Sequence, residues 1–597
     1  MPERDIRIAR KCLESIDAIE LLEDLSEYKR LNVWIFKIRA TVRSHNTELV
    51  PDSTDWYVLV SNSYPLGSID IYPSKENSIT DTFEHQDLNS PTQYHPWRCG
   101  KPCLITDSNI FGDRYDIGEP KHTEKRLEWH LLRLLKWLQK ASEGKLIEPN
   151  ERFETPVFKS GSDPKERIVF TEDNKNLAFW ENQTFSYGLT TFSRSKISPY
   201  LFSNTFMDLN KSQVLQHTWG KAIQQSFFED YLGLWLIIPS PPILKAWSVP
   251  QKWSELKSYL ESLPFDHQTF FKKSLETLRR EKVSKPLIFI GFPIPEFKNG
   301  VPKEIFWQST VFPDLTDRNK MPKKRKKERY LLENDLKNLS QETQIPWIKS
   351  ENWSPANIIA RGACKLSKHK ITVIGAGSLG AEIADCLNRG GCNELTIIDS
   401  DTLQAGNLSR HILKIDDVGF SKTEALENSL NRSNPHSHTK GIQKSLESAY
   451  KENAEIISKS SLIIDTTGSD EVLRFLAELN EDFDAALYSF SIGFQSENLY
   501  FYKSSLKHLN PEAFWTFIRP FIDQDLELMK IFDLPTEGVG CWHKLFPLSY
   551  GDVKFAASCA INYMEQSESS TQEAEIVVAS ISKTPFHNIK ITRQQVD

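Results

Sequence analysis

The glycine-rich stretch that begins at Gly375 constrains the fold more than any other feature of this sequence. A short apolar run at 371–374, rich in β-branched residues, leads directly into Gly375, Gly377 and Gly380, and helix-forming residues follow at 381–387. This order predicts a strand, a tight turn and a helix. Glycines let the turn close and the backbone approach a phosphate, and the helix N-terminus offers N–H groups and partial positive charge to that phosphate. We therefore predict a Rossmann-like nucleotide-binding unit.

The residues after the next predicted strand favour ATP as the nucleotide. That strand, at 395–398, ends in Asp399, close to the roughly 20-residue spacing expected of an acid that binds ribose hydroxyls. Up to this point the pattern suits NAD, FAD or ATP. Asn407, Arg410 and Lys422 follow. Such groups stabilise the charge that builds on phosphates when a nucleoside triphosphate is cleaved, whereas hydride transfer has no use for them.

The order of these residues resembles the adenylation domain of the ubiquitin-activating (E1) superfamily, which includes the bacterial sulfur-carrier activators. The resemblance extends from about Arg361 to the C-terminus. It implies that Asp399 holds the ribose hydroxyls and that Arg361 is the arginine that many members contribute across a dimer, so it also implies a homodimer. The nucleotide-binding residues that it implies are Gly375, Gly377, Gly380, Asp399, Asp401, Asn407, Arg410, Lys422 and Arg361.

The same resemblance implies a magnesium ion (Mg2+) bound with the ATP, and two acids are candidates for its protein ligand. The family usually carries Asp-x-Thr-Asp-Asn after the fourth strand, and the second acid binds the metal. In this sequence Gly468 stands where that acid is expected, between Asp465 and Asp470. Either Asp465 or Asp470 is expected to take the role. The alternative for Asp465 is an acid that caps a helix or ends a strand.

The first 150 residues predict a separate α+β domain. Apolar residues spaced for one helical face at 6–22 precede strand-like runs at 33–40 and 56–60, and an amphipathic helix rich in Leu and Trp is expected at 127–138. A Tyr-Pro, a His-Pro and a Cys-Leu pair precede that last helix in this order. Together these features resemble a ubiquitin-conjugating (E2) domain, in particular its divergent bacterial relatives.

Cys103 is the candidate nucleophile of this domain. The E2 family places its cysteine directly before a leucine and after a His-Pro turn, and Cys103, which precedes Leu104, fits that position better than Cys99. A thiol forms a thioester that survives in water yet reacts with an amine. Trp97 replaces the family's asparagine after His-Pro. That asparagine stabilises the oxyanion of the transition state, so the sequence does not indicate which group does this here. The alternatives are a buried structural cysteine and a small metal site formed by His95, Cys99 and Cys103.

Cys541 is the second candidate thiol. It follows the glycine-rich stretch at 537–540 and lies near His543, a residue type that lowers a thiol pKa or carries a proton. Enzymes of the ubiquitin-activating type carry a catalytic cysteine downstream of the nucleotide site, so the resemblance favours Cys541, with a structural role as the alternative. Cys559 has helical neighbours and is expected to pack in the core.

These features predict a multidomain α/β chain in three parts. Residues 1–150 form the E2-like α+β domain, residues 151–350 a mixed α/β linker or substrate domain, and residues 351–597 the Rossmann-like E1/ThiF adenylation domain with its cysteine. The middle part holds strand-like runs such as those at 234–238 and 287–291, many aromatic residues and proline-marked turns, and its sequence shows no nucleophile or metal cluster.

Composition and charge exclude several classes of function. The formal net charge of −7 argues against general nucleic-acid binding, and the basic run at 323–327 is most simply a solvated linker. The eight cysteines are scattered without a Cys-x-x-Cys pair, which suits a reducing cytoplasm and disfavours a disulfide framework or a four-cysteine zinc site. Neither a membrane-length apolar run nor a secretory signal is evident, so we expect a cytoplasmic protein.

An E2-like end and an E1-like end on one chain resemble the fused conjugation enzymes of bacterial CBASS antiviral operons, the family of the second CD-NTase-associated protein. The resemblance implies that ATP activates the C-terminus of a partner protein, a CD-NTase nucleotidyltransferase, as an adenylate. It further implies that Cys541 forms a thioester, that Cys103 receives the acyl group, and that an acceptor lysine of a target protein takes it. Two alternatives stay open: a ThiF/MoeB-type sulfur-carrier activator and an inactive nucleotide-binding scaffold.

Overall fold

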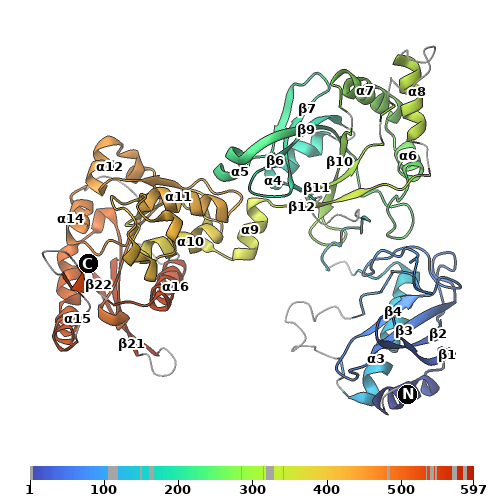
Figure 1. The fold of residues 1–597 in the computed structure, drawn as a ribbon, viewed down its shortest axis with the longest axis horizontal. Coiled ribbons are helices and arrows are strands. Elements are labelled where there is room, and N and C mark those ends of the chain that lie inside the picture. The colour runs from blue at the N-terminus through green and yellow to red at the C-terminus, as the bar shows by residue number, and fades with distance from the viewer. Residues whose placement is uncertain are drawn as a thin grey trace. The chain divides into compact units, whose positions relative to one another are not determined.

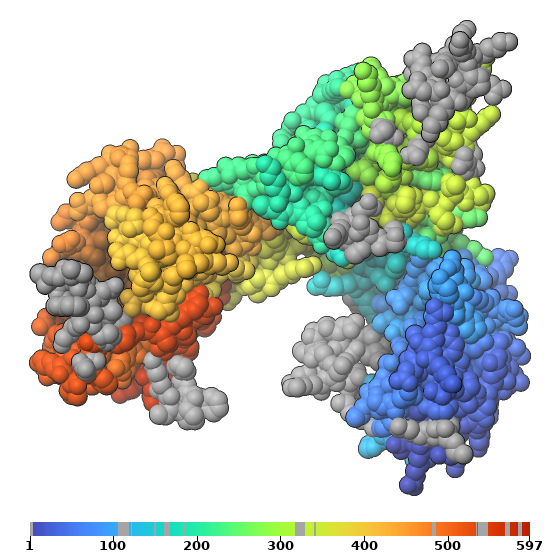
Figure 2. Space-filling model, in the orientation of Figure 1, coloured from blue at the N-terminus to red at the C-terminus, as the bar shows by residue number. Residues whose placement is uncertain are grey.

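The computed structural model describes most of the chain (Figures 1 and 2), and the chain divides into two compact units. The first unit consists of residues 1–193, 199–216 and 230–352, and the second of residues 194–198, 217–229 and 353–597. Within the described ranges, no helix is both long and apolar enough to cross a membrane. The described residues are 4–104, 119–120, 122–147, 151–159, 167–183, 186–283, 285–313, 315–316, 328–339, 342–479, 485–532, 534, 536–537, 543–544, 547–567, 574–582 and 588–596.

The N-terminal part of the first unit is an antiparallel meander whose strands pair in the order β1-β2-β3-β4 (Figure 1). Its core lies between the sheet and α3, where Leu131 and Leu138 share a buried cluster with Trp56 and Val58 of β3. Alternate residues of each strand therefore face this core. The elements are α1 (Arg4–Arg10), the 3₁₀ helix η1 (Lys11–Ser15), β1 (Ile19–Tyr28), β2 (Val33–Thr41), β3 (Ser53–Ser61), β4 (Ile69–Pro73) and α3 (Thr123–Glu143).

The predicted strands and the predicted long helix of this part are confirmed, but the predicted N-terminal helix is too long. The helical pattern at 6–22 ends at Ser15, and Ile19 begins a strand in which it pairs with Ala40 of β2. Apolar residues at intervals of three and four do not separate a helix that continues from a strand that follows it. The ladder with β2 decides the matter, and it depends on residues remote in sequence.

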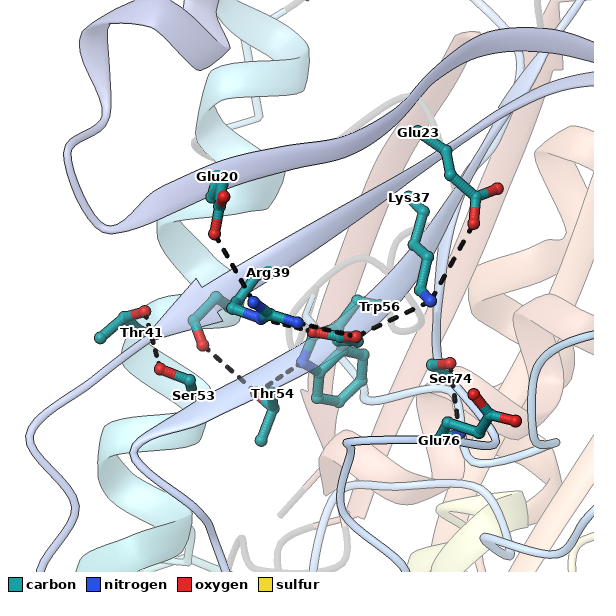
Figure 3. Close-up of polar contacts among 12 residues, drawn as sticks. Glu20, Glu23, Lys37, Arg39, Thr41, Ser53, Thr54, Trp56, Ser74 and Glu76 are labelled. Atoms are coloured by element: carbon teal, nitrogen blue, oxygen red, sulfur yellow. Dashed lines mark hydrogen bonds and ion pairs between the residues drawn. The ribbon is translucent and has the colours of Figure 1, made fainter.

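The other face of the meander carries a polar network (Figure 3). Asp55 of β3 is buried, accepts a hydrogen bond from Nε of Arg39 (2.8 Å) and lies 3.7 Å from Nζ of Lys37. Glu20 and Glu23 of β1 approach the same two cations. Each pair of opposite charges on neighbouring strands stabilises the sheet by roughly 0.2–1 kcal/mol. The network therefore favours one register of β1, β2 and β3.

The rest of the first unit is built on one large sheet. Among the described residues its strand order is β5-β12-β11-β10-β9-β6-β7-β8, and β5 also pairs with β7, so the sheet closes on itself. Inside it, the buried carboxylate of Glu172 accepts hydrogen bonds from the indole N–H groups of Trp180 (3.0 Å) and Trp307 (2.8 Å). The strands are β5 (Arg167–Phe170), β6 (Tyr187–Ser195), β7 (Leu201–Met207), β8 (Gln213–Gln216), β9 (Phe227–Ile237), β10 (Leu287–Pro295), β11 (Pro302–Val311) and β12 (Trp347–Asn352), and the helices are α4 (Asn174–Trp180), α6 (Trp253–Ser262), α7 (His267–Arg280) and α8 (Glu328–Asn338).

The second unit contains the α/β sheet that the glycine-rich sequence predicts. Its order is β15-β14-β13-β16-β17-β18-β21-β22; the strands from β15 to β17 are parallel and the remaining pairings antiparallel. The chain adds strands first on one side of β13 and then on the other, an arrangement that leaves a ligand crevice at the carboxyl ends of the central strands. The predicted multidomain α/β class and the Rossmann-like unit are confirmed.

The strands of this sheet are β13 (Ile371–Ile374), β14 (Leu395–Ile398), β15 (Lys440–Ile442), β16 (Leu462–Asp465), β17 (Ala486–Ile492), β18 (Asn498–Ser505), β21 (Ala574–Ser582) and β22 (Asn588–Val596). The helices are α9 (Pro355–Gly362), α10 (Ser378–Arg389), α11 (Lys422–Ser433), α12 (Leu446–Glu452), α13 (Glu455–Ser458), α14 (Asp470–Glu478), α15 (Pro511–Ile531) and α16 (Tyr550–Ser567). Helices α10 and α16 pack against each other and bury their alanine-rich faces, which lets the two axes approach closely.

A short piece of the middle segment belongs to this second unit. Helix α5 (Lys221–Ser226) packs against α11, where Lys221 forms an ion pair with Glu427. The ring of Trp219 stacks on that of His436 at 5.7 Å. The piece that carries α5 is therefore held on the nucleotide-binding fold by an ion pair and by stacking.

Candidate functional site

The turn between β13 and α10 has the geometry that its glycines predict. Gly375 has a φ of 96°, a left-handed value that favours glycine. A Cβ added at Gly380 would lie 2.0 Å from the carbonyl oxygen of Gly375 and 2.3 Å from Oγ1 of Thr466, so glycine allows α10 to approach the strand ends. Gly377 caps α10, and within the described part of the chain nothing lies within 4 Å of a Cβ built there. The open helix N-terminus suits a phosphate group.

Asp399, at the end of β14, holds the same turn. Its Oδ2 accepts a hydrogen bond from the N–H of Ala376 (2.6 Å), and its Oδ1 accepts one from the N–H of Asp401 (2.8 Å). Asp401 in turn pairs with Nζ of Lys422 (2.8 Å), and Lys422 is only 8% exposed. The acid–lysine pair therefore fixes the ammonium group at the N-terminus of α11.

A cavity of about 350 Å³ lies at the carboxyl ends of β13, β14 and β16, and it brings several predicted residues together. A glycine turn, a helix N-terminus and cationic side chains in one cavity make a site that accepts anionic groups. The predicted residues in its lining are Gly375, Gly377, Asp399, Asp401 and Lys422. Gly380 is not in this lining, but its missing side chain lets α10 pack closely against the turn at Gly375.

Two residues that shape this site were not singled out from the sequence. Nε2 of His411 lies 2.9 Å from the carbonyl oxygen of Ala376, and its Nδ1 accepts the N–H of Leu413 (3.2 Å), so the neutral ring donates through Nε2. Burial lowers the pKa of His411, in agreement with the neutral form. Lys444 lines the cavity after β15, and that strand is too short to give a periodic signal. Neither a periodic pattern nor an apolar run before Lys444 was available to single it out from the sequence.

Asn407, Arg410 and Arg361 lie outside the lining of this cavity as the described residues define it. Asn407 is part of the 3₁₀ helix η7 (Ala405–Ser409), where its Oδ1 accepts the N–H of Gln404 (3.0 Å). Arg410 follows this helix directly, and Arg361 is exposed in the last turn of α9. Their contacts with the triphosphate, and that of Arg361 across a dimer, stay predictions.

The two candidate magnesium ligands differ in their surroundings. Asp465 is fully buried, and its carboxylate accepts hydrogen bonds from the N–H and hydroxyl of Thr467 (3.0 and 2.7 Å) and the hydroxyl of Ser489 (2.7 Å). Burial raises the pKa of this carboxyl. Asp470 is exposed at the first residue of α14, and Gly468 between the two has a φ of 62°. The choice between the acids stays a prediction.

The described residues contain no cluster of side chains that would bind a metal ion without other ligands. Among them, no group of three or more His, Cys, Asp or Glu side chains is arranged to hold a metal ion. Magnesium bound with ATP does not require such a group, because this ion usually keeps several waters and takes phosphate oxygens with one or two carboxylates. The residues at the nucleotide cavity therefore fit a magnesium ion held mainly by phosphate and water.

Cys103 lies in the first unit and is exposed. Its backbone N–H donates to the carbonyl oxygen of His85 (2.7 Å), and a cavity of about 490 Å³ opens beside it. The next residue, Leu104, is buried in the core under the meander. The Cys-Leu pair therefore anchors the chain through the leucine and presents the thiol to solvent.

Trp97, which the sequence resemblance predicts to stand in place of the E2 family's asparagine, is a core residue. It is buried beside the rings of Tyr28 and Tyr57, and the ring of His95 stacks on it with a centroid distance of 4.7 Å. Nδ1 of His95 lies 2.8 Å from the hydroxyl of Tyr28. The enclosed indole therefore holds the His-Pro turn by packing of aromatic rings.

Cys541, the second predicted thiol, lies outside the described residues, as does the basic run at 323–327. In sequence it stands between β19 (Thr536–Glu537) and β20 (His543–Lys544), which pair with each other. Cys559 of α16 packs half-buried against the core, and burial raises its pKa. The predicted core position of Cys559 is confirmed, whereas the role of Cys541 stays a prediction.

Comparison with known proteins gives matches that cover most of the chain. The family model of the Cap2 central linker domain matches residues 144–353, and that of the ThiF family matches residues 350–480. The ATP-dependent ubiquitin transferase-like protein Cap2 of Enterobacter hormaechei subsp. hoffmannii is 30% identical over 550 residues, which are 89% of this chain and 89% of that protein.

Two further similarities are confined to a shorter stretch. A protein of the same description from Vibrio cholerae serotype O1 is 32% identical over 116 residues, 19% of each chain. The molybdopterin-synthase adenylyltransferase of Haemophilus influenzae is 31% identical over 112 residues, which are 19% of this chain and 45% of that enzyme. The similarity to the Enterobacter protein is the one of these that spans both compact units.

Proposed function

The chain belongs to the family of ATP-dependent ubiquitin transferase-like Cap2 proteins, and from this premise we propose that it activates the C-terminus of a partner protein with ATP and conjugates it to target amines. One observation carries the proposal: an anion-accepting cavity built on a glycine turn occurs on the same chain as an exposed cysteine beside a second cavity. The proposed partner is a CD-NTase nucleotidyltransferase, and the proposed setting is CBASS antiphage defence.

In the first proposed step, the carboxylate of the partner's C-terminus attacks the α-phosphorus of ATP. An oxygen–phosphorus bond forms, pyrophosphate leaves, and an acyl adenylate results. The N–H groups at the start of α10 and the ammonium of Lys422 stabilise the phosphate charge. Magnesium supplies further charge neutralisation when it is bound, with Asp465 or Asp470 as its proposed protein ligand.

In the following steps the acyl group passes over two thiols. Cys541 attacks the adenylate carbonyl and releases AMP, which gives a thioester; Cys103 then takes the acyl group, and an acceptor lysine receives it from Cys103. The exposed thiol of Cys103 fits this role. Because both thiols belong to one chain, their effective concentration is raised and the transfer needs no encounter between separate enzymes.

The proposal assigns one role to each of three parts. Residues 1–150 are the ubiquitin-conjugating-like domain, supported by an antiparallel meander followed by the His-Pro turn, the Cys-Leu pair and the long helix α3. Residues 151–350 link the two catalytic ends, and residues 351–597 carry adenylation. Adenylation domains of this superfamily pair, so a homodimer in the cytoplasm, without nucleic-acid or membrane partners, completes the proposal.

Loss of each thiol is expected to stop the reaction at a different place. The protein is incubated with ATP, magnesium and a CD-NTase, and the products are resolved on a non-reducing gel with mapping of adducts. With Cys541→Ala, ATP–pyrophosphate exchange continues and no reducible adduct forms on either thiol. With Cys103→Ala, a reducible adduct accumulates at Cys541 and conjugates disappear. Cys99→Ala, which removes the neighbouring exposed thiol, leaves conjugation unchanged.

Results that contradict the proposed relay would each revise a different part of it. Full conjugation by the Cys103→Ala protein would end the role of Cys103. An adduct on Cys103 that forms without Cys541 would mean direct transfer from the adenylate. Adenylation by the unsubstituted protein without any adduct on Cys103 would favour a sulfur-carrier activator, and the absence of pyrophosphate exchange would favour a nucleotide-binding scaffold.

A further inference from the structure

The cavity beside Cys103 has an apolar wall and a polar, acidic side. Its apolar lining residues are Ile69, Ile71, Pro102, Leu104 and Val157, and its lining also holds Asp87 and Lys101, whose ammonium is paired with Asp70 (2.8 Å). His85 and Glu154 lie in the same lining. Glu154 and Val157 belong to the segment at 151–159, which follows α3 and leads into the large sheet. The cavity at the thiol is therefore completed by residues beyond the predicted end of the N-terminal domain.

This segment is held by the turn between β10 and β11. The N–H of Phe153 donates to the carbonyl oxygen of Glu296 (3.0 Å), and the N–H of Lys298 donates to the carbonyl oxygen of Glu151 (3.0 Å). Nζ of Lys298 also forms an ion pair with Glu84 (3.0 Å), a residue that is 9% exposed. One turn thus fixes both the acidic segment and the stretch that carries the cavity histidine.

His85 is bonded to the backbone of Cys103 on one side and lies close to these acids on the other. Its carbonyl oxygen accepts the N–H of Cys103 (2.7 Å), and its own N–H donates to Oε2 of Glu154 (2.7 Å). Its Nδ1 lies 3.5 Å from the same Oε2, and its Nε2 lies 4.0 Å from Oε2 of Glu151. The φ of His85 is 54°, a left-handed value that is uncommon for a residue other than glycine. Such a conformation persists where the surroundings determine it, often at functional sites.

The other histidine of the lining, His130, is engaged elsewhere. Its side chain is 3% exposed, and its Nε2 lies 2.6 Å from Oε1 of Glu119. The side chain of His85 is 28% exposed. Among the described lining residues, His85 is therefore the histidine that combines access to the cavity with a direct tie to the cysteine.

We propose that this cavity receives the side chain of the acceptor lysine, and that His85 takes a proton from the amine as it attacks the thioester on Cys103. Glu154 acts as the positioning residue for the imidazole ring. The inference rests on the proposed function and names its acceptor site. The apolar wall suits the methylene stem of a lysine, and the carboxylates of Glu151 and Glu154 attract its cationic end.

The proton acceptor is needed because a lysine amine is protonated at neutral pH, with a reference pKa of about 10.4, and only the neutral amine is a nucleophile. The ammonium passes its first proton to His85, which releases it to solvent. The nitrogen then forms a bond with the thioester carbon and passes a second proton to His85. The carbon–sulfur bond breaks, the electron pair leaves with Cys103 as a thiolate, and His85 returns the proton to that thiolate. The products are an amide and the free thiol.

The test separates charging of Cys103 from its discharge. The full-length protein is charged with ATP and a CD-NTase, further charging is stopped with a chelator, and the Cys103 thioester is chased with free lysine or with hydroxylamine. Hydroxylamine is already neutral near pH 7, so it needs no acceptor for a first proton, and its weakly basic nitrogen loses the second proton to water after it attacks. We expect His85→Gln to charge normally, to discharge to lysine about 100-fold more slowly, and to discharge to hydroxylamine at nearly the unsubstituted rate. Glu154→Gln should slow the lysine reaction by about tenfold.

Chemical rescue provides a readout that a structural role would not give. His85→Gly suits the left-handed backbone and removes the ring, so added imidazole should restore discharge to lysine in this variant and leave the unsubstituted protein unchanged. His45→Gln is the matched control. Its ring lies 3.7 Å from Glu143 and its side chain is 60% exposed, as an exposed histidine–glutamate pair outside the cavity lining. It should charge and discharge normally.

The failures are distinguishable. Normal discharge to lysine by charged His85→Gln and His85→Gly would overturn the inference and leave the proposed function standing. Equal loss with lysine and hydroxylamine, without imidazole rescue, would overturn it as well, because it would show a structural defect. Absence of any thioester on Cys103 in the unsubstituted protein would overturn the proposed function and this inference with it. If His85→Gln does not charge, Glu154→Gln decides in the same chase.

Discussion

At the residue scale, His411 links the shape of the nucleotide turn to pH. Its neutral ring donates from Nε2 to the carbonyl oxygen of Ala376 and accepts the N–H of Leu413, and burial lowers its pKa from the ordinary 6.5. The charges that face it are Lys422, Asp399 and Asp417. Because the folded state resists protonation, the unfolded chain binds more protons below pH 6.5. Stability is therefore complete above that pH and falls as the pH drops toward the lowered pKa.

We expect His411→Gln, which keeps a donor but does not titrate, to reduce this acid sensitivity. Each unit by which the pKa is lowered corresponds to about 1.4 kcal/mol. The measurement is the thermal unfolding midpoint, with and without ATP, from neutral pH to values below 6.5. His436 is also buried with a lowered pKa, so part of the dependence should persist. His438→Gln, at an exposed position, is the control, and equal acid sensitivity of His411→Gln and the unsubstituted protein would contradict the assignment.

The residues that sequence reasoning identified are those whose role depends on near neighbours. Gly375, Gly380 and Asp399 act on a turn made by adjacent elements, so their types and spacing were informative. His411 and Lys444 act across the fold: the partner of His411 is Ala376, far away in sequence, and Lys444 reaches the cavity because β15 lies beside β14. The positions of His411 and Lys444 depend on the order of strands in the sheet, and this order cannot be read from the types of the residues.

At the scale of elements, two glycines of the β13–turn–α10 unit are needed for different reasons. Gly380 avoids a steric clash within the fold, and Gly377 leaves space for a phosphate. A methyl group at Gly380 would meet the backbone oxygen of Gly375 at 2.0 Å, whereas one at Gly377 would have no described atom within 4 Å. We expect Gly380→Ala to lower the free energy of unfolding by about 1–3 kcal/mol. Gly377→Ala should change it by less than about 1 kcal/mol but weaken ATP binding by about tenfold or more, because the methyl group occupies the space a phosphate needs.

Chemical denaturation and ATP titration of the two variants check this expectation. Each variant serves as the control for the other, since both add one methyl group within the same turn. Equal losses of stability would mean that α10 adjusts to the larger side chain. Unchanged ATP affinity in Gly377→Ala would place the phosphates elsewhere.

Apolar runs predicted the strands of the nucleotide fold and of the N-terminal meander because those strands are buried, regular and consecutive. The large sheet of the first unit was predicted less well. Its runs at 234–238 and 287–291 correspond to β9 and β10, but β5 pairs with β12 and β7, and neither strand is its neighbour in sequence. Pairing across such separations depends on tertiary packing that a local pattern does not encode.

At the scale of the whole molecule, a homodimer that shares residues between its sites makes a distinctive prediction. If Arg361 acts across the dimer, Arg361→Ala and Lys422→Met each abolish adenylation alone, yet a mixture regains it, because one site of each heterodimer holds an intact Lys422 and the Arg361 of the other chain. Random pairing should restore about a quarter of the unsubstituted rate of ATP–pyrophosphate exchange.

A mixture of Lys422→Met with Asp399→Asn is the matched control. Both residues belong to one chain's own cavity, so no heterodimer contains an intact site and no activity should return. Recovery of ATP–pyrophosphate exchange in this control would mean that the regained activity does not depend on sharing of Arg361 between chains. If the Arg361→Ala mixture regains no activity, each site is confined to a single chain.

The segment at 151–159 has a consequence for how such a chain can be inherited. It leaves the N-terminal fold, yet it supplies the carboxylates beside Cys103 and is bonded to the β10–β11 turn. A recombination event that cut the gene near residue 150 would transfer the thiol and leave Glu151 and Glu154 behind. The two neighbouring folds can therefore be exchanged only as a linked pair, and a lineage that separated them would have to evolve a replacement acidic segment before the thiol regained its surroundings.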